Sequence, residues 1–265
     1  MDNTLRFIGT VRSPVRDRKQ MPPLGAPAAV ELFEPFAPAL LRLEKHSHMW
    51  VLAWLMARPE RDVLQVTPRG VPPDAPDALH GVFAVRSPAR PNPIGLTSAR
   101  LLRVEGLTLH FDRLDFLDGT PVLDLKPYFA ARDLIFSARN TPIGRPKTPD
   151  SLRESLLDQA LRFSPLKHPD LALAVRIIEH YRLEVAAWKE PERWRIAAPL
   201  HRPHLIDALM GIARVSLSQG LRLLSEDRIT LQETAEYLPL AAGMSFDECL
   251  AAPAAELFQF NPGPR

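Results

Sequence analysis

Short runs of apolar residues, several of them alternating with polar residues, follow one another through the first half of the chain. Runs of this length that are rich in Val, Leu, Phe and Thr are typical of β-strands. The predicted strands occupy residues 5–12, 29–32, 49–57, 63–67, 81–86, 96–104, 107–114 and 121–126. One short helix is predicted among them, at residues 38–46. Many short strands without long helices between them favour an antiparallel barrel or sandwich over a doubly wound parallel sheet.

Near the middle of the chain the composition changes. Residues 137–150 contain three prolines and one glycine and show no periodicity, which is typical of a boundary between domains. The predicted domains are residues 1–145 and 146–265. The first has 19 basic and 15 acidic residues and the second has 14 and 16, so their net charges are +4 and −2. This balance permits an anionic partner without requiring one, because nucleic-acid-binding domains are usually far more basic.

In the second domain, apolar residues recur at helical spacing. The predicted helices cover residues 151–163, 170–188 and 204–213. Ser151 with Glu154 fits a capping box, and Asp170 fits a helix N-cap. Residues 215–230 are predicted to form a hairpin. This domain is therefore expected to mix helices and strands.

Composition narrows the class of protein. The longest stretch without Asp, Glu, Lys or Arg is the twelve residues from His46 to Ala57, well short of the roughly 20 apolar residues of a membrane-spanning helix. The N-terminal MDNTLRF lacks the basic and apolar segments of a secretory signal. A single cysteine, Cys249, excludes an internal disulfide framework and fits a reducing compartment. A cytoplasmic protein without a membrane partner is expected.

Proline is unusually abundant, with 28 residues against 12 glycines. Three of these prolines fall in the segment RSPARPNPIG, which also carries Arg86, Arg90 and Asn92. Proline fixes φ and removes an amide donor, so this loop is rigid before any ligand binds. A ligand-binding loop and a stiff surface turn are both consistent with these residues.

A second segment, DFLDGTPVLDLKPY, contains acidic and basic residues around a turn. Asp115 and Asp118 precede the Gly-Thr-Pro turn. Asp124, Lys126 and Tyr128 follow it, two residues apart, so an extended backbone directs them to one face. The alternative interpretation is a routine hairpin connection.

A third segment, HSHMW, contains His46 and His48, which share one face of an extended strand. Such a pair is half of a metal site, but no cysteine or carboxylate partner lies at an obvious spacing. His201 and His204 form a similar pair. Structural histidines are favoured at both places, and no metal is expected.

Four long motifs occur in a fixed order: FIGTVRSP at residues 7–14, HSHMWV at 46–51, GVFAVRSPARPNPIGLT at 81–97 and LDFLDGTPVLDLKPY at 114–128. Together they closely resemble the TsaA/TrmO family, also called YaeB-like. The resemblance implies a single-sheeted antiparallel β-barrel, S-adenosyl-L-methionine as methyl donor, and a homodimer. It also implies N6-methylation of N6-threonylcarbamoyladenosine beside the anticodon of tRNA. The expected fold class is α+β, with this barrel followed by a smaller, mixed, helix-containing C-terminal domain.

The resemblance further implies a set of cofactor-binding positions. They are Pro22, Pro23, His48, Met49, Arg86, Leu96, Asp118, Gly119, Thr120 and Pro121. Arg86 suits the methionine carboxylate, and Asp118 suits the sulfonium or a ribose hydroxyl. Family members often have a Pro-Arg-Gln patch where this chain has the sequence MPPLG, so this loop keeps its proline frame without those polar groups.

Proton transfer and substrate binding need other side chains. The acceptor nitrogen loses a proton as the methyl group arrives, so a general base assists the reaction. The candidate bases, among which the sequence makes no choice, are His48, Asp115, Asp124 and Tyr128. The candidate substrate-binding residues are Arg90, Asn92 and Lys126, of which the two cations suit a carboxylate or a phosphate. No DNA partner is expected.

The second domain keeps other functions open. It does not resemble the shorter C-terminal segment of the bacterial tRNA enzymes, and its charge of −2 is unusual for a phosphate-binding surface. One alternative is an S-adenosylmethionine-dependent methyltransferase of a small metabolite or another RNA. The other is a non-catalytic module that binds S-adenosylmethionine.

Overall fold

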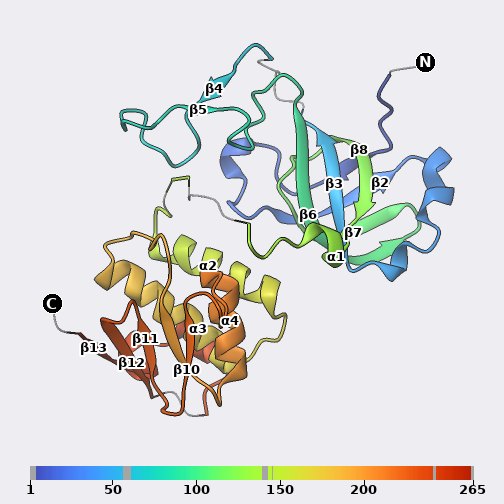
Figure 1. Cartoon of the computed structure of the whole chain (residues 1–265). Helices are drawn as coiled ribbons and strands as arrows, with labels where there is room; N and C mark the ends of the chain where they lie inside the picture. Colours follow the sequence, from blue (N-terminus) through green and yellow to red (C-terminus); the bar gives the residue numbers. More distant parts are fainter. Residues whose placement is uncertain (1–3, 56–60, 139–142, 145, 241–242, 264–265) are drawn as a thin grey trace. The chain divides into compact units, whose positions relative to one another are not determined.

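The computed structural model describes residues 4–55, 61–138, 143–144, 146–240 and 243–263. The chain divides into two units, Met1–Ile135 and Phe136–Arg265, called here the barrel unit and the C-terminal unit (Figure 1). The sequence analysis placed the division at residue 145 instead, inside the proline-rich segment. Residues 139–142 and 145 of that segment lie outside the described residues.

Six strands of the barrel unit close into an antiparallel barrel. They are β1 (Gly9–Arg12), β2 (Ala26–Leu32), β3 (His48–Trp54), β6 (Ile94–Glu105), β7 (Thr108–Leu114) and β8 (Pro121–Pro127). Their order around the barrel is β1-β2-β7-β6-β3-β8. Every neighbouring pair is antiparallel. The predicted α+β class with an antiparallel barrel is confirmed.

Alternation along the strands accounts for the core of the barrel. In β3, Met49, Val51 and Ala53 are buried, whereas His48 and the other even-numbered residues face outward. Successive side chains of a strand point to opposite faces, so one apolar face per strand is sufficient to fill the interior. The last two residues of the predicted strand 49–57 lie outside the described residues.

The predicted strand at residues 81–86 is wrong. Only β5 (His80–Gly81) is a strand there, and it pairs with the short β4 (Gln65–Val66) outside the barrel. The guanidinium of Arg90 donates hydrogen bonds to the backbone carbonyls of Val82 and Val85. These carbonyls are therefore engaged by a side chain, and the segment turns instead of joining a sheet.

The predicted helix at residues 38–46 is replaced by two 3₁₀ segments, η2 (Glu34–Leu40) and η3 (Leu43–Lys45). Arg42 separates them with a φ of 66°. A left-handed residue interrupts the α-helical hydrogen-bond pattern, so a continuous helix cannot form. The segment nevertheless covers the barrel, because Leu40 and Leu43 contact the core.

The antiparallel order determines which connections share an end of the barrel. Strands β1, β3 and β7 finish, and β2, β6 and β8 begin, at the same end. The connections at this end are residues 13–25, 55–93 and 115–120, and we call it the motif end. At the opposite end lie residues 33–47, the turn between β6 and β7, and the chain after β8, including α1 (Ala130–Asp133).

The C-terminal unit combines helices with a second sheet. The helices are α2 (Pro149–Phe163), α3 (Pro169–His180), the π-helical η4 (Tyr181–Val185), α4 (Pro203–Ala213), α5 (Phe246–Ala251) and α6 (Ala254–Leu257). The strands are β9 (Ile196–Pro199), β10 (Leu221–Leu224), β11 (Ile229–Leu231), β12 (Ala235–Pro239) and β13 (Phe258–Pro262). Their order in the sheet is β10-β9-β11-β12-β13. Helices and strands share one hydrophobic core.

Three local predictions for the C-terminal unit need correction. The N-cap of α2 is Thr148, which exchanges hydrogen bonds with Ser151, so Glu154 plays no part in this capping box. The N-cap of α3 is His168, whose ring accepts a hydrogen bond from the amide of Asp170. In both cases the cap precedes a proline at the first helical position, where its missing amide hydrogen costs nothing.

The third correction concerns the predicted hairpin at residues 215–230. Strands β10 and β11 do not pair with each other, because β9 lies between them. β9 is parallel to β10 and antiparallel to β11. Parallel neighbours need a crossover connection, and α4 supplies it by burying Leu205, Leu209 and Ile212. The pairing of β10 with β9 thus depends on the packing of α4, which the local sequence pattern does not predict.

Candidate functional site

At the motif end, the Asp-Gly-Thr-Pro turn is fastened to the loop after β1. One carboxylate oxygen of Asp118 accepts a hydrogen bond from the Ser13 amide at 3.1 Å, and the Asp118 amide donates to the Val15 carbonyl at 2.8 Å. The Gly119 amide donates to the Val11 carbonyl at 2.9 Å. Asp118 also lies 3.5 Å from the guanidinium of Arg16. Two motifs that are far apart in the sequence therefore form one structural piece.

Thr120 and Gly119 have local reasons for their identity. Thr120 is buried, and its hydroxyl donates to the Leu117 carbonyl at 2.7 Å, which closes the turn. Gly119 has a φ of 78°, in the left-handed region where glycine carries no steric penalty. A Cβ at this position would meet open space. The space beside Gly119 is therefore open and accessible to a ligand.

The loop at residues 21–25 lies beside this turn. Met21 is buried in a small cluster to which Leu117 of the turn belongs. Gly25 has a φ of 87°, and a Cβ on it would lie 2.7 Å from the Leu114 carbonyl oxygen, so the two backbones touch. Pro22 and Pro23 remain exposed on the outside of the loop. The structure thus brings these two prolines to the same end as the turn.

Asp115 follows the last residue of β7 and is exposed at the motif end. Its carboxylate accepts a hydrogen bond of 2.6 Å from the hydroxyl of Thr97 in β6. This contact orients the carboxylate while leaving its other lone pairs available. Of the four candidate bases, Asp115 is the one that lies at the motif end.

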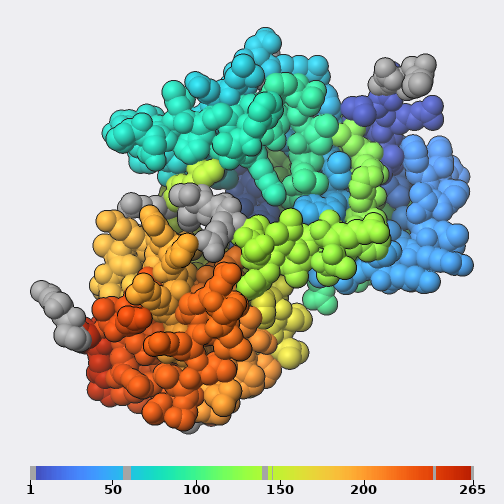
Figure 2. All heavy atoms as spheres, viewed as in Figure 1, coloured from blue at the N-terminus to red at the C-terminus, as the bar shows by residue number. Residues whose placement is uncertain are grey.

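The long connection between β3 and β6 also belongs to the motif end. Arg86 is exposed, whereas Arg90 uses its guanidinium to hold the connection in shape, as described above. Arg69 donates a hydrogen bond of 3.2 Å to the Met21 carbonyl and so joins this connection to the loop of Pro22 and Pro23. Figure 2 shows residues 61–93, coloured cyan to teal, as an exposed lobe.

A pocket of about 340 Å³ opens in this connection. It is lined by Phe83, Arg90, Pro91, Asn92 and Ile94. The structure therefore brings together Arg90 and Asn92, two of the three predicted substrate-binding residues. Phe83 was missed, because the segment that contains it has the composition of a strand. Its signal was its place inside the long motif GVFAVRSPARPNPIGLT.

The remaining candidates lie on the outer face of the barrel. Lys126 pairs with Asp124 at 2.6 Å, as their shared strand face predicted. The Tyr128 ring lies 5.6 Å from that of Trp50 and 6.4 Å from that of His48. Leu96 of β6 is exposed on the same face, where Leu52 lies between it and Asp124.

Met49 differs from its neighbours because its side chain fills the core. It is 1% exposed and lies among the buried residues of the barrel interior. Any ligand contact in one chain would need its backbone, which is already paired with both β6 and β8. The structure therefore explains Met49 as a core residue.

The candidate residues form two groups in one chain. Asp115, Asp118 and their neighbours lie at the motif end, whereas His48 begins β3 at the opposite end. β3 has seven residues, which corresponds to about 20 Å at the usual strand rise. A single barrel therefore does not bring His48 to the Asp-Gly-Thr-Pro turn.

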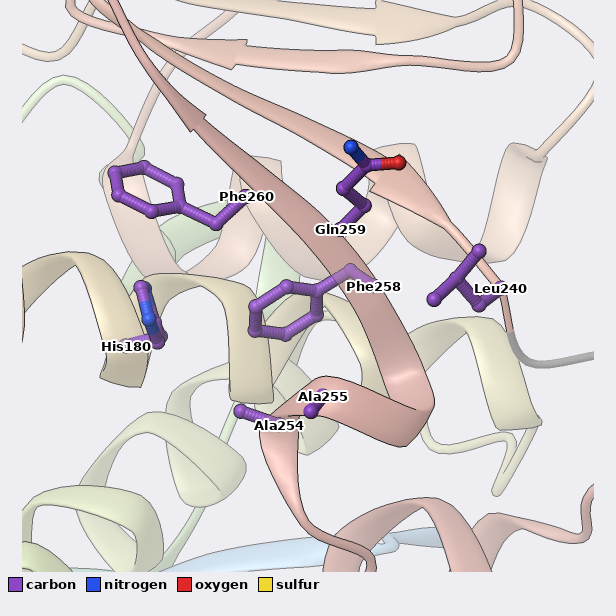
Figure 3. A pocket seen from close by; sticks show the side chains of 7 residues that line it. All are labelled: His180, Leu240, Ala254, Ala255, Phe258, Gln259 and Phe260. Atoms are coloured by element: carbon purple, nitrogen blue, oxygen red, sulfur yellow. The ribbon is translucent and has the colours of Figure 1, made fainter.

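The C-terminal unit has a pocket of its own, of about 560 Å³ (Figure 3). Phe258 and Phe260 project from one side of β13 toward His180, and Gln259 projects from the other. The His180 ring lies 3.2 Å from the Tyr237 hydroxyl. Burial lowers the pKa of His180 and raises that of Tyr237. None of the predicted site residues lines this pocket.

Two further properties concern the described residues as a whole. No group of three or more His, Cys, Asp or Glu side chains within them is arranged to hold a metal ion. None of the helices in the described part of the chain is both long and apolar enough to cross a membrane.

Comparisons with known proteins match the barrel unit. Residues 10–134 match the family described as tRNA-methyltransferase O N-terminal domain. A probable S-adenosyl-L-methionine-binding protein of Methanothermobacter thermautotrophicus is 41% identical over 133 residues, which cover 49% of this chain and 92% of that protein. The chain belongs to the TrmO family. The family is S-adenosylmethionine-dependent, so the cofactor expected from the sequence is the cofactor of the family.

Other relatives of this TrmO family member differ in length. A probable S-adenosyl-L-methionine-binding protein of Archaeoglobus fulgidus is 40% identical over 179 residues, and the match spans 65% of this chain but only 46% of that protein. The mouse tRNA (adenine(37)-N6)-methyltransferase is 44% identical over 95 residues, 36% of this chain and 21% of that enzyme. A crystal structure of TrmO from Pseudomonas aeruginosa aligns over 89% of this chain and 91% of its own, at 24% identity and a TM-score of 0.43.

Proposed function

We propose that this chain is a cytoplasmic methyltransferase that uses S-adenosylmethionine to methylate N6 of N6-threonylcarbamoyladenosine beside the anticodon of tRNA. The observation that supports it most strongly is that parts of three of the four family motifs lie together at one end of the barrel. Loops from three different connections meet there and are joined by backbone hydrogen bonds and by the side chains of Asp118 and Arg69. The name of the mouse relative, which refers to N6 of adenine 37 in tRNA, supports the acceptor.

The residues of the motif end fit this cofactor chemically. Arg86 offers an exposed guanidinium for the methionine carboxylate. Asp118 keeps 24% of its side chain exposed while it is anchored to Ser13, so it presents a fixed carboxylate to the sulfonium or to a ribose hydroxyl. The open space above Gly119 accommodates a flat ligand. When bound, S-adenosylmethionine supplies an electrophilic methyl group, and the protein has mainly to position it and the acceptor.

Asp115 is our proposed general base within one chain. Its carboxylate is exposed, lies at the motif end and is oriented by the Thr97 hydroxyl at 2.6 Å. Transfer of the methyl group would break its bond to the sulfonium, which would leave as a neutral thioether, and Asp115 would accept the proton that the acceptor nitrogen releases. Arg90 and Asn92 line the adjoining pocket and would contact the substrate.

We further propose that the enzyme is a homodimer in which a second copy supplies His48 and Tyr128. The support is the separation of these residues from the motif end of their own barrel, about 20 Å along β3. Their exposed face also carries Lys126, paired with Asp124. A partner barrel would bring this face against the motif end of the first.

Mixing two inactive variants tests the shared site. His48→Ala and Asp118→Ala are each expected to lose methyl transfer. When they are unfolded and refolded together in equal amounts, mixed dimers regain one intact site each, roughly a quarter of the wild-type activity. Each variant refolded alone is the control. A mixture that stays as inactive as its components would contradict a shared site.

Labelled S-adenosylmethionine separates the proposed reaction from its alternatives. The protein is incubated with total tRNA and, in parallel, with tRNA lacking the threonylcarbamoyl group. Label transferred only to the modified tRNA supports the proposal. Label transferred only to a small-molecule extract supports the metabolite methyltransferase that the −2 charge of the second domain favours. Binding of S-adenosylmethionine without transfer to any acceptor supports the non-catalytic module.

A further inference from the structure

Phe83 is an aromatic side chain that the fold leaves 86% exposed, the largest exposed fraction among the large hydrophobic residues described. Its neighbour Val82 is 1% exposed. Burying a phenylalanine usually stabilises a protein by about 1.5–3 kcal/mol, and this stabilisation is forgone here. Because Phe83 lines a pocket, its exposed ring is accessible to a ligand in that pocket.

The backbone that carries Phe83 is held firmly. The Val82 amide donates to the Leu64 carbonyl at 3.0 Å, and the Ala84 amide donates to the Gly81 carbonyl at 2.9 Å. Arg90 donates to the carbonyls of Val82 and Val85, on both sides of the phenylalanine. The ring therefore extends from a fixed frame, and little conformational entropy is lost when a ligand binds to it.

The pocket beside Phe83 combines this ring with polar groups. Asn92 and Arg90 line it together with Pro91 and Ile94. An amide such as that of Asn92 carries both hydrogen-bond donors and an acceptor, which suits the edge of a nucleobase. A flat apolar surface beside an amide is the arrangement that proteins use for unpaired bases of RNA, which stack on aromatic rings and bond through their edges.

The position of the pocket connects it with the proposed reaction. Its connection begins and ends at the motif end, where β3 finishes and β6 begins. Arg69, in the same connection, is bonded to the loop of Pro22 and Pro23. A base seated at Phe83 thus lies on the same end of the barrel as the residues assigned to the cofactor.

We propose that Phe83 is the stacking platform for the acceptor nucleobase and that Asn92 holds the edge of this base. The inference rests on the proposed function and adds to it Phe83 as a contact residue and the part of the acceptor that Asn92 contacts. Because a base in an anticodon loop is already unpaired, stacking on one ring is enough to hold it outside the loop.

Kinetics of methyl transfer to tRNA provide the first test. Phe83→Ala is expected to raise KM for tRNA on the order of ten- to a hundredfold, since stacking on one aromatic side chain contributes about that much. Binding of S-adenosylmethionine, measured by calorimetry, stays unchanged. Phe83→Trp restores KM, whereas Phe83→Leu does not, because leucine is apolar but has no ring. Phe33→Ala is the matched control, since Phe33 is 46% exposed at the opposite end of the barrel.

Fluorescence provides a second test that needs no methyl transfer. An anticodon stem-loop with 2-aminopurine in place of the acceptor adenosine loses fluorescence when that base stacks on a ring. The wild type and Phe83→Trp are expected to quench it, and Phe83→Ala and Phe83→Leu are not. If the wild type transfers no methyl group but quenches the probe, the proposed function fails and the platform stands. The platform is overturned if Phe83→Leu matches the wild type, if Phe83→Ala leaves KM and quenching unchanged, or if Phe83→Ala abolishes S-adenosylmethionine binding.

Discussion

The two units of this protein use charged side chains in opposite ways. In the barrel unit, both members of a pair such as Arg12–Glu31 are about half exposed, and so are Asp124 and Lys126. In the C-terminal unit, Glu179 is 3% exposed and lies 2.5 Å from Arg176, itself buried, and 3.0 Å from Arg153. Exposed charges are available to a ligand, whereas buried charges are held by one another.

This difference agrees with our proposal that the catalytic and cofactor-binding residues belong to the barrel unit. A buried ion pair adds little net stability, because desolvation offsets the attraction, but it tolerates no missing partner. Two arginines of the C-terminal unit are held in such contacts: Arg176 by Glu179 and the Ala252 carbonyl, Arg182 by the Trp188 carbonyl and Glu190. The barrel unit keeps Arg86 and Asp115 at its surface, where chemistry can reach them.

The largest expected effect follows from breaking the buried charge cluster. Glu179→Ala leaves the buried Arg176 without its counter-charge and Arg153 with only Asp150 at 3.9 Å, and is expected to destabilise the C-terminal unit by about 3–5 kcal/mol. Denaturant unfolding followed by hydrogen exchange in α3 measures this loss. Cofactor binding by the barrel unit is expected to persist.

Arg162→Ala provides the control in the same unit. It removes an ion pair in which Arg162 is 52% exposed and Asp158 is 14% exposed, expected to be worth about 1 kcal/mol. Equal unfolding midpoints for Glu179→Ala and Arg162→Ala would show that burial of the charge cluster does not increase the cost of losing a partner.

Substitutions at two glycines of the motif end distinguish an effect on stability from an effect on ligand binding. Gly25→Ala combines a left-handed φ with contact at 2.7 Å to the Leu114 carbonyl, so a loss of about 2–4 kcal/mol is expected. Gly119→Ala meets open space and costs only about 1 kcal/mol. We expect Gly119→Ala nevertheless to weaken S-adenosylmethionine binding more than its stability loss explains. Thermal unfolding measures the loss of stability, and calorimetric titration measures S-adenosylmethionine binding. Unchanged binding in Gly119→Ala would show that the turn is not part of the cofactor site.

Substituting one lysine in each unit tests which unit carries the RNA-binding surface. Lys126→Ala in the barrel unit is expected to weaken tRNA binding a few-fold and to reduce the slope of log K against log salt by about 1, as for one phosphate contact. Lys189→Ala removes an exposed lysine of the C-terminal unit and is expected to change neither. Filter binding at several salt concentrations checks this. A change at Lys189 but not at Lys126 would reverse our assignment of the phosphate-binding surface.

The smallest expected effect is a pH dependence of the C-terminal unit. Burial lowers the pKa of His180 in the folded protein, so the unfolded chain binds a proton there at higher pH. Stability is therefore complete above the ordinary value of 6.5 and falls as the pH drops below it toward the lowered pKa. His180→Gln, which keeps a hydrogen-bond partner for Tyr237, is expected to flatten this fall. His46→Gln in the barrel unit should leave it intact, and an unaltered profile in His180→Gln would contradict the assignment.

Local pattern was a good guide where one strand or helix buries one face. Residues 49–54 of the predicted strand 49–57 lie in β3, and α4 covers nearly the predicted range. The shared face of Asp124 and Lys126 was also predictable, because successive side chains of a strand alternate whatever the partner strand is.

Contacts between distant segments were not predictable from local pattern. Asp118 and Ser13 are 105 residues apart, and their hydrogen bond exists because β1 and β8 are neighbours in the barrel. Arg90 prevents its own segment from forming a strand by bonding to the carbonyls of Val82 and Val85. Nothing in the composition of that segment records this contact.

By itself, the sequence determined the all-β character of the first unit, the family to which it belongs and the residue types of the motifs, because these depend on short periods and on residue order. Only the tertiary structure decided which motifs meet. Strand order places three connections at the motif end and His48 at the opposite end of the barrel. The fold also leaves Phe83 exposed beside Asn92. The physical reason is that a site is made of side chains from different strands, whose neighbours are chosen when the barrel closes.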